Sequence, residues 1–399
     1  MRIGLVNLIA KTSEVLSNPT SVLRTSIPSP RSDADLNIVG MGRRIVSRGH
    51  EVRIFVADDF RPRESVGGSG PLRIEYLPTR LSTAFPPSVA PLTPSLISRL
   101  KGERFDIVQT GELFQPGTLL SWIGSGGIDT RMFIWQELDV MMRPPAGFLQ
   151  QGFYRTLGKV VVGDCARVIP RSLSARDHLL GQSVPEEKIA PVVHSGVDTE
   201  IFRPMDKESC RKAFDIDGVG NIVLAVSRLD PIKGLDTLIR AMTVVSEEIR
   251  DSLLVIQGNG PAYPELLSLV RSLGIEGNVK FIAESFPHDS MPPLYNIADV
   301  LSITSRIDLF PFVAIEAISC GIPLATSFAR GLKTDIVDKG GGVMLPQDHN
   351  AMGEALVCLL QDRSRLSVLA RDGRELAAKE FDFEVCADRF LKIYEGTGA

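Results

Sequence analysis

Residues 222–234 read Ile-Val-Leu-Ala-Val-Ser-Arg-Leu-Asp-Pro-Ile-Lys-Gly, and they predict a strand, a loop and the start of a helix. The apolar run 222–226 is typical of a buried strand. After the glycine, apolar residues recur at helical spacing, at Leu235, Leu238, Ile239, Met242 and Val245. Arg228 and Lys233 lie on the loop between them, where open α/β sheets bind ligands. Either cation alone is typical of a solvated surface, but the two together at a helix start favour an anion site.

A second cluster, with two carboxylates, surrounds another predicted helix start. Residues 312–320 are apolar on nearly every side of a helix except at Glu316, so the helix is expected to be buried. Pro311 suits its first turn and Gly321 suits its stop. A buried Glu316 is costly unless it is paired or hydrogen-bonded, and a purely structural role is one interpretation. Asp308, eight residues earlier, favours a binding site instead.

The pattern of the whole chain predicts an α/β protein with two doubly wound halves. Strands alternate with helical patterns, which is the signature of parallel sheets. The predicted strands are 2–7, 52–57, 72–77, 105–110, 131–135, 222–226, 253–257, 279–283, 299–303, 323–326 and 342–345. A length of 399 residues also exceeds one ordinary core, which favours two domains that meet near residues 198–204.

Composition excludes several classes of protein. The chain is 44% hydrophobic and 23% charged, as expected of a globular protein, and no apolar run approaches the roughly 20 residues of a membrane span. The five cysteines are scattered and indicate reduced thiols in a cytoplasmic enzyme. The basic excess before residue 203 is small, and no nucleic-acid groove is expected.

Several motifs in order resemble the retaining glycosyltransferases of family four, which have the GT-B fold. Residues 226–234 resemble the donor phosphate motif, and Asp308 to Glu316 resembles the Glu-x7-Glu motif with Asp in first place. The other similar stretches are 48–52, 194–204, 254–261 and 294–300. The resemblance implies two Rossmann-like domains facing a cleft, an acceptor domain at 1–200 and a nucleotide-sugar domain at 201–383. A closing helix, at about 384–399, would pack back onto the first domain.

The resemblance also implies roles for individual residues. Arg228 and Lys233 would bind the diphosphate, Glu316 the ribose and Asp308 the sugar hydroxyls. Backbone N–H groups near Phe310, Pro311 and Phe312 would add to the phosphate site, and the loop containing Ile282 would meet the base. The reaction implied is retaining transfer from a nucleotide diphosphate-sugar to a hydroxyl acceptor, with no metal and no other cofactor.

The first half departs from the family pattern, and here alternatives stay open. Residues 8–36 form a long Ser-, Thr- and Pro-rich connection in place of a short glycine loop. Within it, Asp33-Ala34-Asp35 has the form of a metal motif, although N-capping explains it better. Gln136-Glu137 stands where the family often has His, and Glu137 is interpreted as either a polar contact or a surface residue.

The sequence does not identify the acceptor, and a glycan, a lipid-linked molecule and a small molecule stay open as alternatives. The apolar and basic stretch 141–155 either lines the acceptor cleft, touches the inner face of a membrane as a peripheral contact, or simply packs. A sugar-nucleotide epimerase, a phosphorylase of the same fold and a non-catalytic nucleotide-sugar-binding subunit remain the alternative functions.

Overall fold

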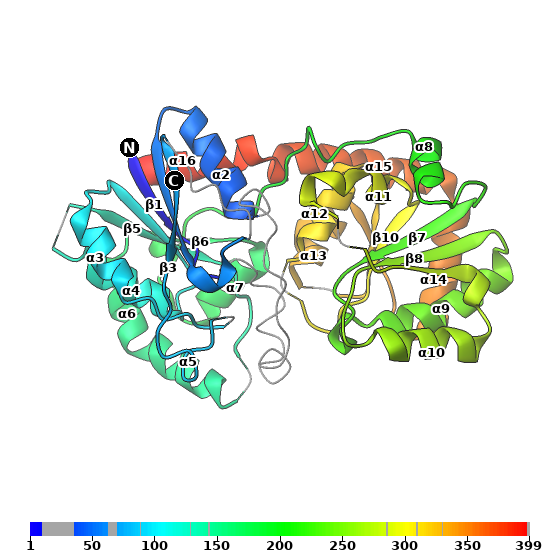
Figure 1. The fold of residues 1–399 in the computed structure, drawn as a ribbon, viewed down its shortest axis with the longest axis horizontal. Helices are drawn as coiled ribbons and strands as arrows, with labels where there is room; N and C mark the ends of the chain where they lie inside the picture. Colours follow the sequence, from blue (N-terminus) through cyan, green and yellow to red (C-terminus); the bar gives the residue numbers. More distant parts are fainter. Residues whose placement is uncertain are drawn as a thin grey trace. The chain divides into compact units, whose positions relative to one another are not determined.

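The computed structural model describes residues 1–9, 36–62, 70–87, 89–127, 129–142, 144–284, 286–308, 310–328 and 330–396. The chain divides into two compact units (Figure 1). The first unit combines Met1–Gly196 with Phe383–Ala399, and the second is Val197–Asp382.

The first unit contains a six-stranded parallel sheet in the order β3-β2-β1-β4-β5-β6. Its strands are β1 (Arg2–Val6), β2 (Glu51–Ala57), β3 (Leu72–Leu77), β4 (Ile107–Gly111), β5 (Arg131–Gln136) and β6 (Arg167–Pro170). Its helices are α2 (Asn37–Ser47), α3 (Ser95–Gly102), α4 (Pro116–Ser125), α5 (Ala146–Arg155), α6 (Leu157–Asp164), α7 (Leu173–Gly181) and α16 (Phe383–Glu395), with short 3-10 helices at Asp58–Phe60 and Glu186–Lys188. This strand order is that of dinucleotide-binding α/β folds.

The C-terminal helix α16 is part of the first unit. Phe383, Cys386, Phe390 and Tyr394 are buried in its core, and the Tyr394 hydroxyl donates to Gln109 Oε1 on β4 at 2.6 Å. Phe381, just before this helix, belongs to the core of the second unit.

The second unit repeats the arrangement, with the parallel order β12-β11-β10-β7-β8-β9. Its strands are β7 (Asn221–Val226), β8 (Ser252–Gln257), β9 (Val279–Ile282), β10 (Val300–Ile303), β11 (Leu324–Thr326) and β12 (Gly342–Met344). Its helices are α8 (Lys207–Ala213), α9 (Leu235–Glu248), α10 (Tyr263–Leu273), α11 (Pro292–Asn296), α12 (Phe312–Ser319), α13 (Arg330–Asp335), α14 (His349–Gln361) and α15 (Arg363–Leu376). Short 3-10 helices lie at Pro231–Lys233, Glu276–Asn278, His288–Ser290 and Val337–Lys339, and a π-helix at Ala377–Phe381.

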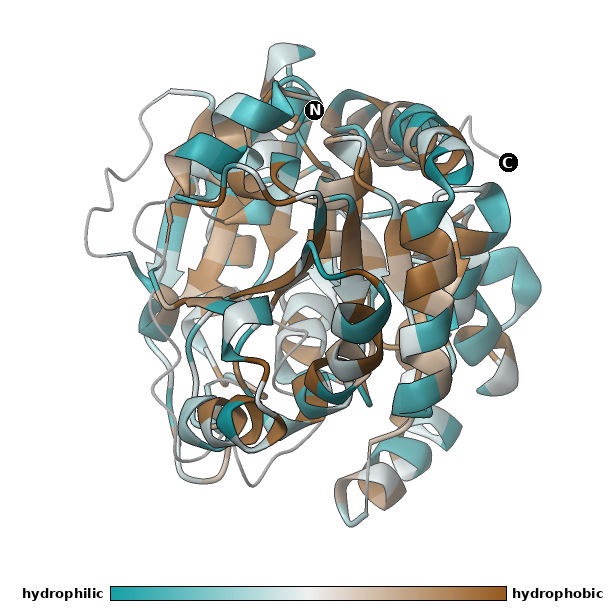
Figure 2. Ribbon diagram, turned by 90° about the vertical axis from the view of Figure 1, so that its right-hand side faces the viewer, coloured by the Kyte–Doolittle hydropathy of each residue, from teal (hydrophilic) through white to brown (hydrophobic). Residues whose placement is uncertain are grey.

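The sheet of the second unit is buried on both faces. Along β7, Ile222 and Leu224 join one hydrophobic cluster, while Val223 and Ala225 join the other. Figure 2 shows strands that are largely hydrophobic and helices that have one hydrophobic and one hydrophilic side. A near-continuous apolar run such as 222–226 is what a strand covered by helices on both faces requires.

All eleven predicted strands are present, with bounds within two residues of the prediction. The strand β6 was missed, because its four residues end in proline and carry little pattern. One further detail was wrong. Pro311 does not lie in the first turn of α12 but precedes it in extended conformation, so the helix begins at Phe312.

Candidate functional site

Two loops of the second unit leave its sheet side by side. The strands β7 and β10 are hydrogen-bonded neighbours, yet the chain continues from β7 to β8 on the opposite side. The loops that follow β7 and β10 therefore begin at the point where the strand order reverses, which is where open α/β sheets bind ligands. Arg228 and Lys233 lie on the first loop and Asp308 on the second, so the fold brings the predicted residues to one edge.

Hydrogen bonds hold the two loops together. The Thr304 hydroxyl donates to the carbonyl oxygens of Lys233 and Gly234, each at 3.1 Å, and Arg306 N–H donates to the Ile232 carbonyl at 2.7 Å. Gly234 has a φ of +64°, and a Cβ there would lie 2.2 Å from the Thr304 carbonyl oxygen. Only glycine fits this position, so it sets both the start of α9 and the separation of the loops.

Lys233 and Asp308 form a buried ion pair. Lys233 Nζ lies 2.9 Å from Asp308 Oδ2, and the exposed fractions of the side chains are 9% and 2%. The Ser305 hydroxyl donates to the same carboxylate oxygen at 3.1 Å. An ammonium has three N–H donors, and Asp308 uses one of them, so Lys233 can bind a phosphate without leaving Asp308. The expected roles of the two residues, one for diphosphate and one for sugar, are thus physically linked.

Arg228 is oriented by Asp230, a residue that sequence reasoning passed over. The guanidinium lies 2.8 Å from Asp230 Oδ2, while Asp230 Oδ1 accepts from Ile232 N–H at 3.1 Å. The neighbouring Gly258-Asn259-Gly260 turn packs against this loop, and a Cβ at Gly258 would lie 1.9 Å from the Ser227 carbonyl oxygen. The glycines at 258 and 260 are explained by this close approach.

Glu316 lies on α12 with both carboxylate oxygens engaged. Oε1 is 2.9 Å from His288 Nε2, and Oε2 accepts a short hydrogen bond from the Tyr295 hydroxyl. Burial and the charge of Glu316 raise the pKa of Tyr295 well above its usual value, so the hydroxyl stays a donor. Sequence reasoning missed His288, because it lies 28 residues before Glu316 and the two meet only in the fold.

The remaining predicted donor residues lie at the start of α12 and at the end of β9. The Phe310 side chain is 2% exposed and packs on Phe381 with ring centroids 5.9 Å apart, so it belongs to the core. The helix α12 after it has no side-chain cap and no acidic residue in its first turn, which suits an anion. Ile282 ends β9, and its carbonyl accepts from Gly258 N–H at 3.0 Å, which ties the predicted base-binding loop to the glycine turn.

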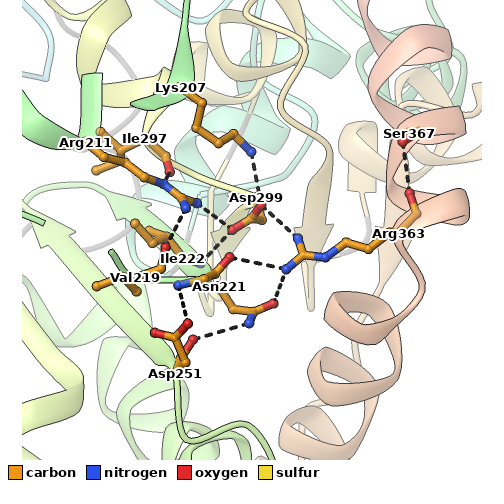
Figure 3. Close-up of polar contacts among 11 residues, drawn as sticks. Lys207, Arg211, Val219, Asn221, Ile222, Asp251, Ile297, Asp299, Arg363 and Ser367 are labelled. Atoms are coloured by element: carbon orange, nitrogen blue, oxygen red, sulfur yellow. Dashed lines mark hydrogen bonds and ion pairs between the residues drawn. The ribbon is translucent and has the colours of Figure 1, made fainter. Parts of the chain in front are cut away.

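A second charged cluster lies at the start of β10 and has a structural role. Lys207, Arg211 and Arg363 all converge on the carboxylate of Asp299 (Figure 3), at 3.0, 2.9 and 3.0 Å. Ile222 N–H also donates to Asp299, at 2.7 Å. Burial opposes ionisation of this carboxyl, but the charges of Lys207 and Arg211 and the Ile222 hydrogen bond outweigh it and lower the pKa of Asp299. Asp299 thereby joins α8, α15 and the sheet.

The first unit has a pocket at the equivalent point of its own sheet. Asn7, Gln109, Glu112, Gln115 and Glu137 are among the residues that line it, and no described lining residue is cationic. Glu112 accepts from the N–H groups of Glu137 and Leu138 at 3.0 and 2.9 Å, and Glu137 pairs with Arg171 at 2.9 Å. Burial, together with the charge of Glu137, raises the pKa of Glu112 well above its usual value. Sequence reasoning missed Glu112, and it had treated Glu137 as an isolated residue.

Two family models match the chain. "Glycosyl transferases group 1" matches residues 206–376, and "Glycosyltransferase Family 4" matches residues 38–201. The chain belongs to glycosyltransferase family 4. Similar curated proteins include the D-inositol 3-phosphate glycosyltransferases of Thermobispora bispora, 31% identical over 60% of this chain and 58% of that protein, and of Rhodococcus opacus, 30% identical over 59% and 54%. The match thus spans little more than half the length of these relatives.

Solved structures confirm the predicted GT-B fold. Sucrose-phosphate synthase from Thermosynechococcus elongatus superimposes with a TM-score of 0.76 at 19% identity, covering 99% of this chain and 98% of that one. HepE of Anabaena, solved with UDP, gives a TM-score of 0.74 at 16% identity, covering 99% and 100%. Within the described residues, no helix is long and apolar enough to cross a membrane. Asp33-Ala34-Asp35 lies outside the described residues.

Proposed function

We propose that this protein is a retaining glycosyltransferase that moves a sugar from a nucleotide diphosphate-sugar to a hydroxyl group, without a metal. The observation that supports the proposal is the grouping of charged residues at one edge of the second sheet. There, Arg228, Lys233 and the uncapped start of α12 gather positive charge, while Asp308 and Glu316 supply carboxylates. This is the complement of a diphosphate that has hydroxylated rings on both sides.

In this proposal, the donor's diphosphate binds to Arg228, to the free N–H donors of Lys233 and to the start of α12. These groups stabilise the charge that develops on the leaving phosphate. Glu316 exchanges its contact with the half-exposed His288 for the ribose hydroxyls, while Tyr295 keeps the carboxylate in place. Asp308 holds Lys233 and faces the transferred sugar. The leaving phosphate then takes the proton of the acceptor hydroxyl, so that no separate base is required.

The acceptor's reactive part is expected to be uncharged. Glu112 and Glu137 make the pocket of the first unit neutral or anionic, and Arg171 is already neutralised by Glu137. A phosphorylated ring, as in the name of the inositol 3-phosphate relatives, would meet repulsion there. We therefore favour a hydroxyl of a glycan or of a lipid-linked molecule as the acceptor. HepE was solved with UDP-glucose, so UDP-sugars are the first donors to test.

The test is a panel of UDP- and GDP-sugars, first by thermal shift and then by release of nucleoside diphosphate with candidate acceptors present. Binding raises apparent stability, so the donor base is identified before any acceptor is known. We expect one base to be preferred, and a product with the anomeric configuration of the donor. Conversion of the sugar nucleotide without acceptor would indicate an epimerase, and an inverted product would refute the retaining mechanism. A chain that binds no nucleotide-sugar would overturn the proposal.

A further inference from the structure

The helices α5 and α6 carry an exposed apolar surface on the first unit. The two helices follow each other and pack together (Figure 1). Phe148 and Leu149, adjacent on α5, are 71% and 70% exposed, and Val160 on α6 is 50% exposed. Large apolar side chains with this exposure, gathered on one surface, mark an interaction site more often than single exposed residues do.

The outward side chains are not needed to hold α5 in place. On its inner side, Tyr154 is 4% exposed, and Gln150 is fully buried and accepts from Met142 N–H at 2.7 Å. Phe148 and Leu149 therefore add little to the core. They expose apolar area to water and contribute little to the stability of the fold.

Among the residues of α5 and α6, the cations are Arg155 and Lys159, and the acidic residue is the exposed Asp164, four residues after Val160. Between Asp139 and Asp164 the sequence contains no acidic residue. Arg155 and Lys159 are exposed there, and neither forms an ion pair with any described residue. Arg155 lies seven residues after Phe148, hence on the same face of the helix two turns later. Apolar side chains flanked by unpaired cations are characteristic of segments that lie in the interface of an anionic membrane.

We propose that this surface, formed by Phe148, Leu149, Leu157, Val160, Arg155 and Lys159, docks the protein on an anionic lipid bilayer. The bilayer is favoured over a second copy of the chain, because pairing through this surface would bring Arg155 and Lys159 of both copies together. The apolar side chains enter the headgroup region, and the two cations bind lipid phosphates. Combined with the proposed function, on which only this step rests, docking would give the transferase access to a lipid-linked acceptor.

The test is co-sedimentation of the full chain with vesicles of phosphatidylcholine alone and with vesicles that also contain phosphatidylglycerol. No donor or acceptor is added, so the result does not depend on transfer activity. We expect binding to the anionic vesicles that weakens with salt. Arg155→Glu with Lys159→Glu should reduce partitioning by at least about 25-fold, from roughly fivefold per lost cation. Phe148→Ser with Leu149→Ser should reduce it by on the order of tenfold or more.

Matched controls come from the same unit. Leu81, which is 67% exposed between β3 and α3, and Lys101 on α3 provide the control variant Leu81→Ser with Lys101→Glu, which should bind as the wild type does. Because all the replaced side chains are exposed, every variant should melt at the wild-type temperature. Absence of vesicle binding, equal loss in the control, or a dimer that forms without lipid and requires Phe148 would each overturn the proposal.

Discussion

The buried pair of Lys233 and Asp308 allows a double-mutant cycle in which stability and ligand binding test each other. Asp308→Asn keeps an acceptor for Ser305 but leaves the ammonium of Lys233, which is only 9% exposed, without a counter-charge. Breaking one partner of a buried pair typically costs about 3–5 kcal/mol. Since both side chains are almost fully excluded from water, we expect Asp308→Asn to lose about 3 kcal/mol of unfolding free energy. Lys233→Met should lose a similar amount, but the double variant should lose less than the sum.

The assay is urea unfolding of the four proteins, repeated with saturating UDP or GDP. A diphosphate that contacts Lys233 supplies the missing negative charge. The nucleotide should therefore reduce the difference in unfolding free energy between Asp308→Asn and the wild type. The exposed pair of Lys333 and Asp338, at 2.8 Å and about half exposed, is the control, and Asp338→Asn should cost less than about 1 kcal/mol. An Asp308→Asn variant as stable as the wild type, or a loss that is unchanged by nucleotide, would refute the reasoning.

Three further predictions concern other residues of the chain. Asp299→Asn should destabilise the protein at neutral pH by about 3 kcal/mol, because three cations converge on this buried carboxylate. Folding lowers the pKa of Asp299, so its contribution to stability is present above the unfolded pKa of about 3.9 and disappears as the pH falls through the lower folded value. Urea unfolding at acid pH should therefore give similar unfolding free energies for the variant and the wild type. Glu316→Gln should bind the nucleotide more weakly, as measured by calorimetry, whereas Asp308→Asn should still bind the nucleotide but lose sugar transfer. Equal nucleotide affinities for the wild type and Glu316→Gln would contradict the assignment of Glu316 to the ribose. Transfer should survive EDTA, and activity that disappears with chelator and returns with manganese would instead support a metal site at Asp33-Ala34-Asp35.

Much of the second unit could be predicted because its determinants are local. One continuous stretch contains the strand 222–226, the cations of its loop and the helix from Leu235. The hydrophobic period and the order of these segments are therefore enough to predict them. The apolar run around Glu316 likewise predicts a buried helix that must satisfy one carboxylate. What could not be predicted is which donor does so. His288 and Tyr295 are distant in sequence and reach Glu316 only through the fold.

The first unit shows the opposite case. Glu112 carries no local signal, and its role depends on the register that places β4 beside β5, where it meets the N–H groups of Glu137 and Leu138. Arg171, at the end of the missed strand β6, completes the same cluster. Because β6 was not predicted, there was no reason in the sequence to pair Glu137 with Arg171.

The most direct measurement of the central claim is calorimetric titration of UDP and GDP into the wild type, Arg228→Ala and Lys233→Ala. Lys212→Ala, on the exposed side of α8, controls for loss of a positive charge. We expect each of the two site variants to lose about 1.5–3 kcal/mol of binding free energy for the preferred nucleotide, the scale of a charge-assisted hydrogen bond, while the control binds normally. Unchanged affinity in both Arg228→Ala and Lys233→Ala would contradict the assignment of this edge of the sheet as the donor site.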